Sequence, residues 1–210
     1  MRGKTLSWIS VALLVATFAS IALIDRPLAL LIHEQLGGIT NAARGFTTLL
    51  EWIFAFEVSK YLYAFALLLI AGGLHLFDRS AARARVWYFV GSTLLLSRVI
   101  SGTLKNVFER VRPAEFVKSR ELADFFIDGG SSFPSGHSAF YFGLLFPRAL
   151  LFPRWKWPIL LFAALAALSR VFEVDHYLAD ILASALVAAL LTYAIAGLLR
   201  LPTPASKPTS

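Results

Sequence analysis

The chain has 210 residues, of which 58% are hydrophobic and only 16% are charged, and its formal net charge is +7. Soluble globular domains contain about 25% charged residues, so this composition excludes an ordinary water-soluble enzyme and a disordered chain. The chain has no cysteine, which excludes thiol catalysis, cysteine-bound zinc and disulfide bonds. No basic stripe interleaved with aromatic residues is found, so we expect no nucleic acid partner.

The apolar residues form long blocks, and a transmembrane helix needs about 20 mainly apolar residues. Six blocks are near this length, so the sequence predicts an all-α polytopic membrane protein. Residues 1–200 are expected to form a single domain with six transmembrane helices, and residues 201–210 a disordered tail rich in Pro, Ser and Thr. The expected spans are Leu6–Ile24, Tyr61–Phe77, Val86–Leu104, Ser138–Phe152, Trp157–Phe172 and Tyr177–Leu199.

Orientation follows from the charges of the short connections. Six alternating spans place both termini on one side, together with two connections that hold one acid, Asp78, against five bases: Arg79, Arg83, Arg85, Arg154 and Lys156. The positive-inside rule makes this side cytoplasmic. For a compact chain of bacterial type, we expect the inner membrane, with the longer segments facing the periplasm. A cleaved signal peptide is an alternative for the first block, although its apolar core is longer than usual.

The segment 40–57 is too polar to span a membrane. Its apolar residues Phe46, Leu49, Leu50 and Ile53 recur at helical spacing, while Thr47, Thr48, Glu51 and Glu57 face elsewhere. This pattern predicts an amphipathic helix along the outer interface. Two interpretations remain open, namely simple packing against the bundle and a lid or wall beside an active site.

Polar residues that are costly in a bilayer gather at the outer ends of the predicted spans. They come from distant parts of the chain, yet the alternation of spans places all of them on one side. Unrelated polar substitutions would divide between both sides. The residues are Lys105, Arg112, Ser135, Gly136, His137, Ser169, Arg170, His176 and Asp180.

These residue types favour phosphate chemistry. Lys105, Arg112 and Arg170 are three cations without an equally close set of acids, which indicates an anionic ligand. Ser135 and Gly136 begin a predicted helix, whose free N–H groups and dipole attract an anion. His176 and Asp180 are four residues apart, so on one helix they lie on the same face. The carboxylate then fixes the imidazole tautomer and leaves the other nitrogen as a nucleophile. His137 supplies a second imidazole for proton transfer, as phosphoryl transfer requires.

The spacing of these residues resembles the three-part signature of the type 2 phosphatidic acid phosphatase (PAP2) family. The three parts are Lys105 with Arg112-Pro113, then Pro134-Ser135-Gly136-His137, then Ser169-Arg170 with His176 and Asp180. The chain departs from the usual pattern in two places, since Leu178-Ala179 stands where many relatives have Pro-Ser, and Ala183 stands where a glycine is common. We expect these departures to affect helix packing rather than chemistry.

The resemblance implies a role for each residue. His176 would attack phosphorus and form a phosphohistidine, Asp180 would orient it, and His137 would protonate the leaving oxygen and then activate water. Five residues would hold the phosphate oxygens: Lys105, Arg112, Ser135, Gly136 and Arg170. No metal and no other cofactor is implied.

The remaining polar residues carry weaker expectations. Arg98 and Ser169 are expected to support the site; for Arg98 an ion pair with Asp180 or another buried acid is favoured over a bond to a main-chain carbonyl. Glu173 and Asp175 are interpreted as solvated acids. Arg110 is assigned to a solvated outer loop together with further charged residues, namely Glu115, Lys118, Arg120, Glu121, Asp124 and Asp128.

The predicted function is therefore hydrolysis of a lipid phosphomonoester or pyrophosphate at the outer face of the membrane. Phosphatidylglycerophosphate, phosphatidic acid, undecaprenyl pyrophosphate and lipid A phosphates are the candidate substrates, and the sequence does not choose among them or fix the oligomeric state. Two alternatives are kept. One is a lipid phosphotransferase that uses the same histidine, and the other is a non-catalytic membrane protein.

Overall fold

The computed structural model describes residues 2–56, 58–77, 81–119, 126–127 and 129–201. Within these ranges the secondary structure is helical and contains no strand, which confirms the all-α class. Most of the predicted disordered tail and the acidic part of the 120–128 loop lie outside the described residues. The helices are α1 (Arg2–Ala19), a π-helical turn (Ser20–Ile24), α2 (Asp25–Gln35), α3 (Gly37–Ile53), α4 (Leu62–Phe77), α5 (Ala81–Phe108), α6 (Pro113–Ser119), α7 (Gly136–Leu151), a 3-10 turn (Pro153–Trp155), α8 (Lys156–Phe172) and α9 (Leu178–Leu198).

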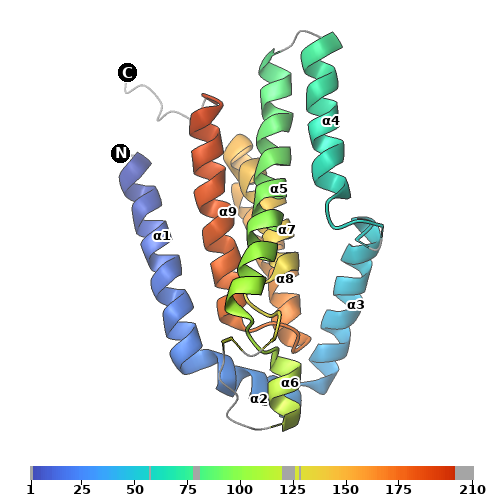
Figure 1. Ribbon diagram of the computed structural model, residues 1–210, viewed down its shortest axis with the longest axis vertical. Helices are drawn as coiled ribbons and strands as arrows, with labels where there is room; N and C mark the ends of the chain where they lie inside the picture. The colour runs from blue at the N-terminus through green and yellow to red at the C-terminus, as the bar shows by residue number, and fades with distance from the viewer. Residues whose placement is uncertain (1, 57, 78–80, 120–125, 128, 202–210) are drawn as a thin grey trace.

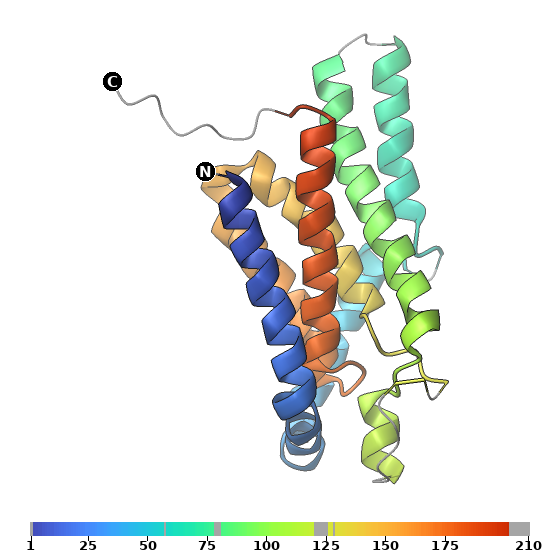
Figure 2. The same cartoon turned by 60° about the vertical axis from the view of Figure 1, so that its left-hand side comes forward.

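The long helices run roughly along one axis and form an elongated bundle (Figure 1). Helix α1 begins and α9 ends at the same end of the bundle, where α4 also ends and α5 begins. The short helices α2 and α6 lie at the opposite end (Figures 1 and 2). Helices α3 and α4 follow one another along the axis, so the chain crosses the bundle there in two separate helices.

Helices α5, α7 and α9 pack on one another at the centre, and small residues allow this close approach. A Cβ atom at Gly143 of α7 would lie 2.9 Å from the Ser97 side chain of α5 and 3.1 Å from the Leu94 main chain. The buried face of α9 is made largely of alanines, among them Ala179, Ala185 and Ala188. Small residues at helix contacts are typical of membrane bundles, because van der Waals packing, rather than exclusion of water, stabilises them.

The exterior of the bundle is apolar. Large side chains on several helices are mostly exposed, including Leu69 at 75%, Phe77 at 88% and Trp157 at 74%. In water such a surface would aggregate. Among the described residues, three helical segments are long and apolar enough to cross a membrane, and they are Trp8–Gln35, Pro153–Phe172 and Leu178–Leu198. Helix α4 is apolar but shorter, so these features support a membrane protein without establishing six spans.

The helix predicted over 40–57 is found as α3, but its apolar residues do not all face the protein. Leu49 and Ile53 are about half exposed and Trp52 is 78% exposed, whereas Thr47 is buried. Thr47 bonds to Ser169 of α8, with 2.9 Å between the hydroxyl oxygens. The buried residues of α3 are Ala43, Thr47 and Leu50, so its inward edge combines apolar packing with one polar contact. Large apolar side chains also lie on its outward edge.

Candidate active site

A pocket of about 380 Å³ lies where the lower parts of α5 and α8, the start of α7 and the end of α3 meet. Seven of the predicted site residues line it: Arg98, Lys105, Arg112, Gly136, His137, Arg170 and His176. Asp180, Ser135 and Ser169 are buried and do not line the pocket. Residues that the sequence analysis did not assign to the site complete the wall, namely Glu51, Phe56, Lys60, Tyr61, Ser101, Gly102 and Asp175.

His176 is held by the start of α9. Asp180 lies in the first turn of that helix, and its Oδ2 is 3.3 Å from His176 Nδ1. The same oxygen accepts hydrogen bonds from the Tyr177 N–H at 2.9 Å and from the Ser132 hydroxyl at 2.5 Å. A carboxylate at Nδ1 places the proton on that nitrogen, which leaves Nε2 as the unprotonated nitrogen. Burial lowers the pKa of His176, and Asp180 opposes this effect, so the neutral, nucleophilic form is favoured at neutral pH.

Arg110 fixes Asp180 from the other side. Its Nη1 is 2.6 Å from Asp180 Oδ1, its Nη2 is 2.7 Å from Asp25 Oδ2, and all three side chains are fully buried. The guanidinium also lies over the Tyr177 ring, 4.1 Å from its centroid. Asp25 accepts further bonds from the Ser20 hydroxyl and the Ala179 N–H.

This network corrects the assignment of Arg110 to a solvated loop. Nothing in the sequence marks Arg110 as buried, because it stands in a polar stretch between two predicted spans. Asp25 likewise follows an apolar block directly, as any headgroup-level acid would. Only the fold brings Asp25, Arg110 and Asp180 together from three separate regions of the chain.

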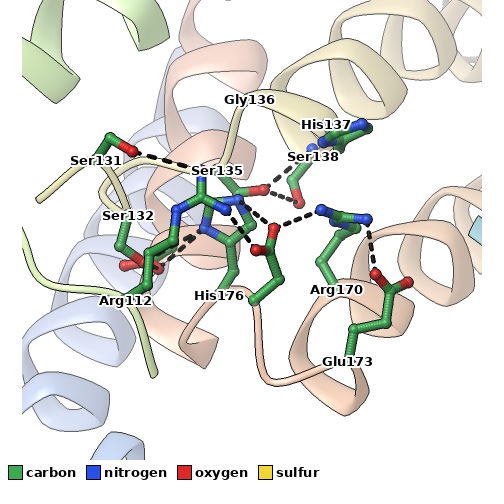
Figure 3. A network of polar contacts seen from close by, with 12 residues as sticks. Arg112, Ser131, Ser132, Ser135, Gly136, His137, Ser138, Arg170, Glu173 and His176 are labelled. Carbon is green, nitrogen blue, oxygen red and sulfur yellow. Dashed lines mark hydrogen bonds and ion pairs between the residues drawn. The ribbon is translucent and has the colours of Figure 1, made fainter. Parts of the chain in front are cut away.

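The predicted phosphate-binding cations converge at the mouth of the pocket. Arg112 and Arg170 reach toward the same region beside His176 (Figure 3), and Lys105 donates to the Ser131 carbonyl. The expectation that no acids lie as close is wrong. Asp175 accepts a bond from both Arg112 and Arg170.

Glu173 is also close to these cations, since it lies 2.8 Å from Arg170 Nη1. Its carboxylate is largely buried and also accepts from Thr47. The interpretation of Glu173 and Asp175 as solvated acids is therefore wrong as well. Both acids belong to the turn between α8 and α9, and both are bound to Arg170.

At the start of α7, the Ser135 hydroxyl does not point to the phosphate-binding role that the resemblance implies. Ser135 is the N-cap of α7, and its hydroxyl oxygen accepts from the Ser138 N–H at 3.3 Å and from the Ser138 hydroxyl at 3.0 Å. The hydroxyl is thus used for capping. Gly136 faces the pocket, and a Cβ there would lie 2.9 Å from Arg98 Nη1, so a side chain would displace that guanidinium.

The contacts of Arg98 and Ser169 differ from the support of the site that the sequence predicts. Arg98 donates to the Gly136 carbonyl, which is the less favoured of its two predicted roles, and Arg110 makes the pair with Asp180 instead. Ser169 bonds to Thr47 and to the Ala166 carbonyl. Its contact therefore joins α8 to α3 and lies behind the pocket wall.

His137 faces the pocket from the first turn of α7. Its Nε2 lies 2.8 Å from Glu51 Oε1, and both side chains are partly exposed, at 22% and 33%. Its ring stacks on Phe56, with 4.9 Å between centroids and 12° between planes. Glu51 and Phe56 belong to α3 and the turn after it, so the lid-or-wall interpretation of segment 40–57 fits the contacts better than simple packing does.

Comparison with known proteins agrees with this arrangement. Residues 85–201 match the family model described as the PAP2 superfamily, so the chain belongs to this family. It is 30% identical to an undecaprenyl-diphosphatase of Bacillus subtilis, BcrC, over 70% of this chain and 73% of the relative. It is 30% identical to a lipid A 1-phosphatase of Rhizobium johnstonii, over 74% and 69%, and 27% identical to one of Rhizobium etli, over 74% and 72%. No solved structure shows significant similarity.

The class predicted from the sequence is thereby confirmed. The protein is a PAP2-type phosphoric monoester or diphosphate hydrolase, and its apolar helices are those of a membrane lipid phosphatase.

Proposed function

We propose that this protein hydrolyses a lipid-borne phosphomonoester or diphosphate through a phosphohistidine formed on His176. The observation that carries the proposal is the position of His176. Its Nδ1 faces Asp180 and its ring borders a pocket lined by Lys105, Arg112 and Arg170. A nucleophilic nitrogen beside three cations suits a phosphoryl group, whose transfer depends mainly on positioning and charge neutralisation.

The reaction proceeds in two balanced steps. His176 Nε2 attacks phosphorus, the bond from phosphorus to the leaving oxygen breaks, and His137 donates a proton to that oxygen. Water then attacks the phosphorus, the phosphorus–nitrogen bond breaks, and His137 takes up the proton of the water. Inorganic phosphate leaves, and His176 returns to its neutral form. The pair Asp25 and Asp180 outweighs the single charge of Arg110, so the buried network is net negative and stabilises the positive charge on the phosphorylated imidazole.

The catalytic end of the bundle is proposed to face the periplasm. In support, Arg83, Arg85, Arg154 and Lys156 lie in or beside the connections at the opposite end, where α1 begins and α9 ends, and such connections are cytoplasmic by the positive-inside rule. Six membrane crossings follow if α3 and α4 share one of them. Helix α7 has 16 residues, about 24 Å at 1.5 Å per residue, so the pocket at its start is recessed into the outer leaflet, within reach of a lipid headgroup.

The substrate is proposed to be an isoprenoid diphosphate or a phosphate on lipid A, because the relatives named above act on these classes. Phosphatidylglycerophosphate and phosphatidic acid share the same phosphate chemistry and are kept as candidate substrates. The pocket of about 380 Å³ accommodates a phosphate headgroup, while the hydrocarbon tail stays in the bilayer.

The test is phosphate release by the purified protein in detergent micelles across these four lipids. We expect release from at least one of them, near-total loss in His176→Ala, inhibition by vanadate and no loss in EDTA. Transfer of phosphate to a second lipid without release indicates the phosphotransferase. Full activity of His176→Ala, or a strict requirement for added magnesium, contradicts the proposed mechanism.

A further inference from the structure

Asp175 lies where the two arginines of the pocket meet. Its Oδ1 accepts from Arg112 Nη1 and its Oδ2 from Arg170 Nη2. Oδ2 is also 3.6 Å from His176 Nε2. The carboxylate thus contacts both predicted phosphate-binding arginines and faces the proposed nucleophile. Figure 3 shows Arg112 and Arg170 on either side of this region.

The other acids near the pocket make different contacts. Glu173 also bonds to Arg170, but it is tied to Thr47 of α3 and does not line the pocket. Glu51 bonds to His137 and is 3.9 Å from Arg170. Among the described acids, Asp175 is the one that contacts both guanidinium groups and lies near His176 Nε2.

The charge of Asp175 and the backbone of the preceding residue both favour the position of this carboxylate between the two arginines. Burial alone would raise the pKa of Asp175, but His176, Arg170 and Arg112 lower it to about 2, so the group is an anion at neutral pH. The preceding residue, Val174, has φ of 60°. A β-branched residue rarely adopts this conformation, and such backbone strain persists where the surrounding structure enforces it.

A carboxylate and a phosphate offer the same paired oxygens to a guanidinium. The N–H groups of Arg112 Nη1 and Arg170 Nη2 that bond to Asp175 cannot bond to a phosphate at the same time, so a phosphate that binds through these two groups displaces the carboxylate from them. We propose that Asp175 is an internal competitor for the phosphate site, which weakens the binding of free phosphate and so favours a substrate held at the site by its lipid tail. This inference rests on the proposed phosphate site, and it adds a residue that sets the selectivity of that site.

The experiment is a binding comparison without turnover. Dissociation constants for inorganic phosphate and for vanadate are measured by calorimetry on purified wild-type protein, Asp175→Asn and Asp175→Glu. Removal of a like charge a few ångströms from the ligand is expected to tighten both ligands about tenfold or more in Asp175→Asn. Asp175→Glu keeps the anion and is expected to bind nearly as weakly as the wild type.

The matched control is Glu34→Gln. Glu34 is exposed on α2 and does not line the pocket, so this variant makes the same charge change away from the site and should leave both constants unchanged. Thermal melting verifies that each variant is folded, and Asp175→Ser replaces Asp175→Asn if the latter is not.

Three outcomes overturn the inference. They are unchanged or weaker binding in Asp175→Asn, equal tightening in Glu34→Gln, and no binding by any variant. Absence of phosphate release from every lipid, with tighter vanadate binding still seen in Asp175→Asn, instead refutes the proposed function and leaves the internal competitor standing.

Discussion

The two histidines of the pocket are held in contrasting ways. His176 is buried and fixed through Asp180 to a network of fully buried charges that includes Arg110 and Asp25. His137 is partly exposed, and its partners Glu51 and Phe56 come from a single region at the end of α3. Preorganised polar groups stabilise a developing charge most strongly where water is excluded. The proposed nucleophile, His176, accordingly lies in a buried and rigid network. The acid must meet the departing lipid and then water, so it lies at an accessible edge.

The largest effect is expected from Asp180→Asn. The amide cannot fix the Nδ1 proton in the same way, and loss of the corresponding carboxylate in a serine-protease triad costs about 10⁴-fold in kcat. We expect a loss of about 10³- to 10⁴-fold, measured as phosphate release from the best lipid. Vanadate binding by calorimetry serves as the control for folding. A loss below about tenfold would show that His176 does not depend on its carboxylate.

His137→Ala tests the acid role of the partly exposed histidine. General acid catalysis contributes about 10²- to 10⁴-fold, and it matters most when the leaving group is poor. The variant should therefore lose activity of that order on a lipid phosphomonoester and far less on an activated aryl phosphate. Rates on both substrates, measured on the same preparation, decide the point. Equal losses would exclude the acid role.

Asp25→Asn tests, through the stability of the protein, whether the buried charge network behind His176 is structural. The change removes the Asp25 carboxylate from Arg110 and leaves its buried pair with Asp180, and breaking a buried ion pair costs about 3–5 kcal/mol. We expect a marked fall in the denaturation midpoint of the protein in detergent. Glu34→Gln, an exposed charge change on the same helix, should cost no more than about 1 kcal/mol, as exposed charges do. Equal stability of the two variants would show that the network is not structural.

The smallest effect is expected from Glu51→Gln. The pair that it forms with His137 is partly exposed, and such pairs are worth about 0.2–1 kcal/mol. We expect kcat/KM to fall by no more than about fivefold. Glu173→Gln, which removes another acid that contacts Arg170 Nη1, serves as a comparison for loss of a nearby acid. A loss as large as that of Asp180→Asn would mean that α3 supplies a catalytic group and that the two histidines are held equally firmly.

Much of the fold was predictable because hydrophobic blocks in a membrane protein are long and continuous. The predicted span Trp157–Phe172 lies inside α8, and Tyr177–Leu199 agrees with α9 to within one residue at each end. Other boundaries differ: α5 extends from Ala81 to Phe108, well past Val86–Leu104, because α-helical hydrogen bonding continues beyond the apolar stretch. The role of α3 was harder to predict, since apolar side chains lie on both its buried and its exposed edges, and hydrophobic periodicity alone does not show which edge faces the protein.

The residues of the site also divide into those that the sequence identifies and those that it does not. His137, Arg112 and Arg170 were identified because short-range spacing on helix starts and ends is visible in a single sequence. Asp25, Arg110 and Asp175 were missed or read as solvated, because an ionisable residue in a polar stretch has the same appearance whether it is bound or free.

The sequence by itself determined the chemical class of this protein. Short spacings such as His176 to Asp180 act across the start of one helix, since His176 lies just before the N-cap of α9 and Asp180 lies in its first turn, and there local geometry decides which side chains meet. Only the tertiary structure decided which acid pairs with which arginine, because those contacts join distant residues, 85 positions apart for Asp25 and Arg110 and 70 for Arg110 and Asp180. Electrostatic partners in a buried site depend on distances across the fold, and no periodicity along the chain encodes them.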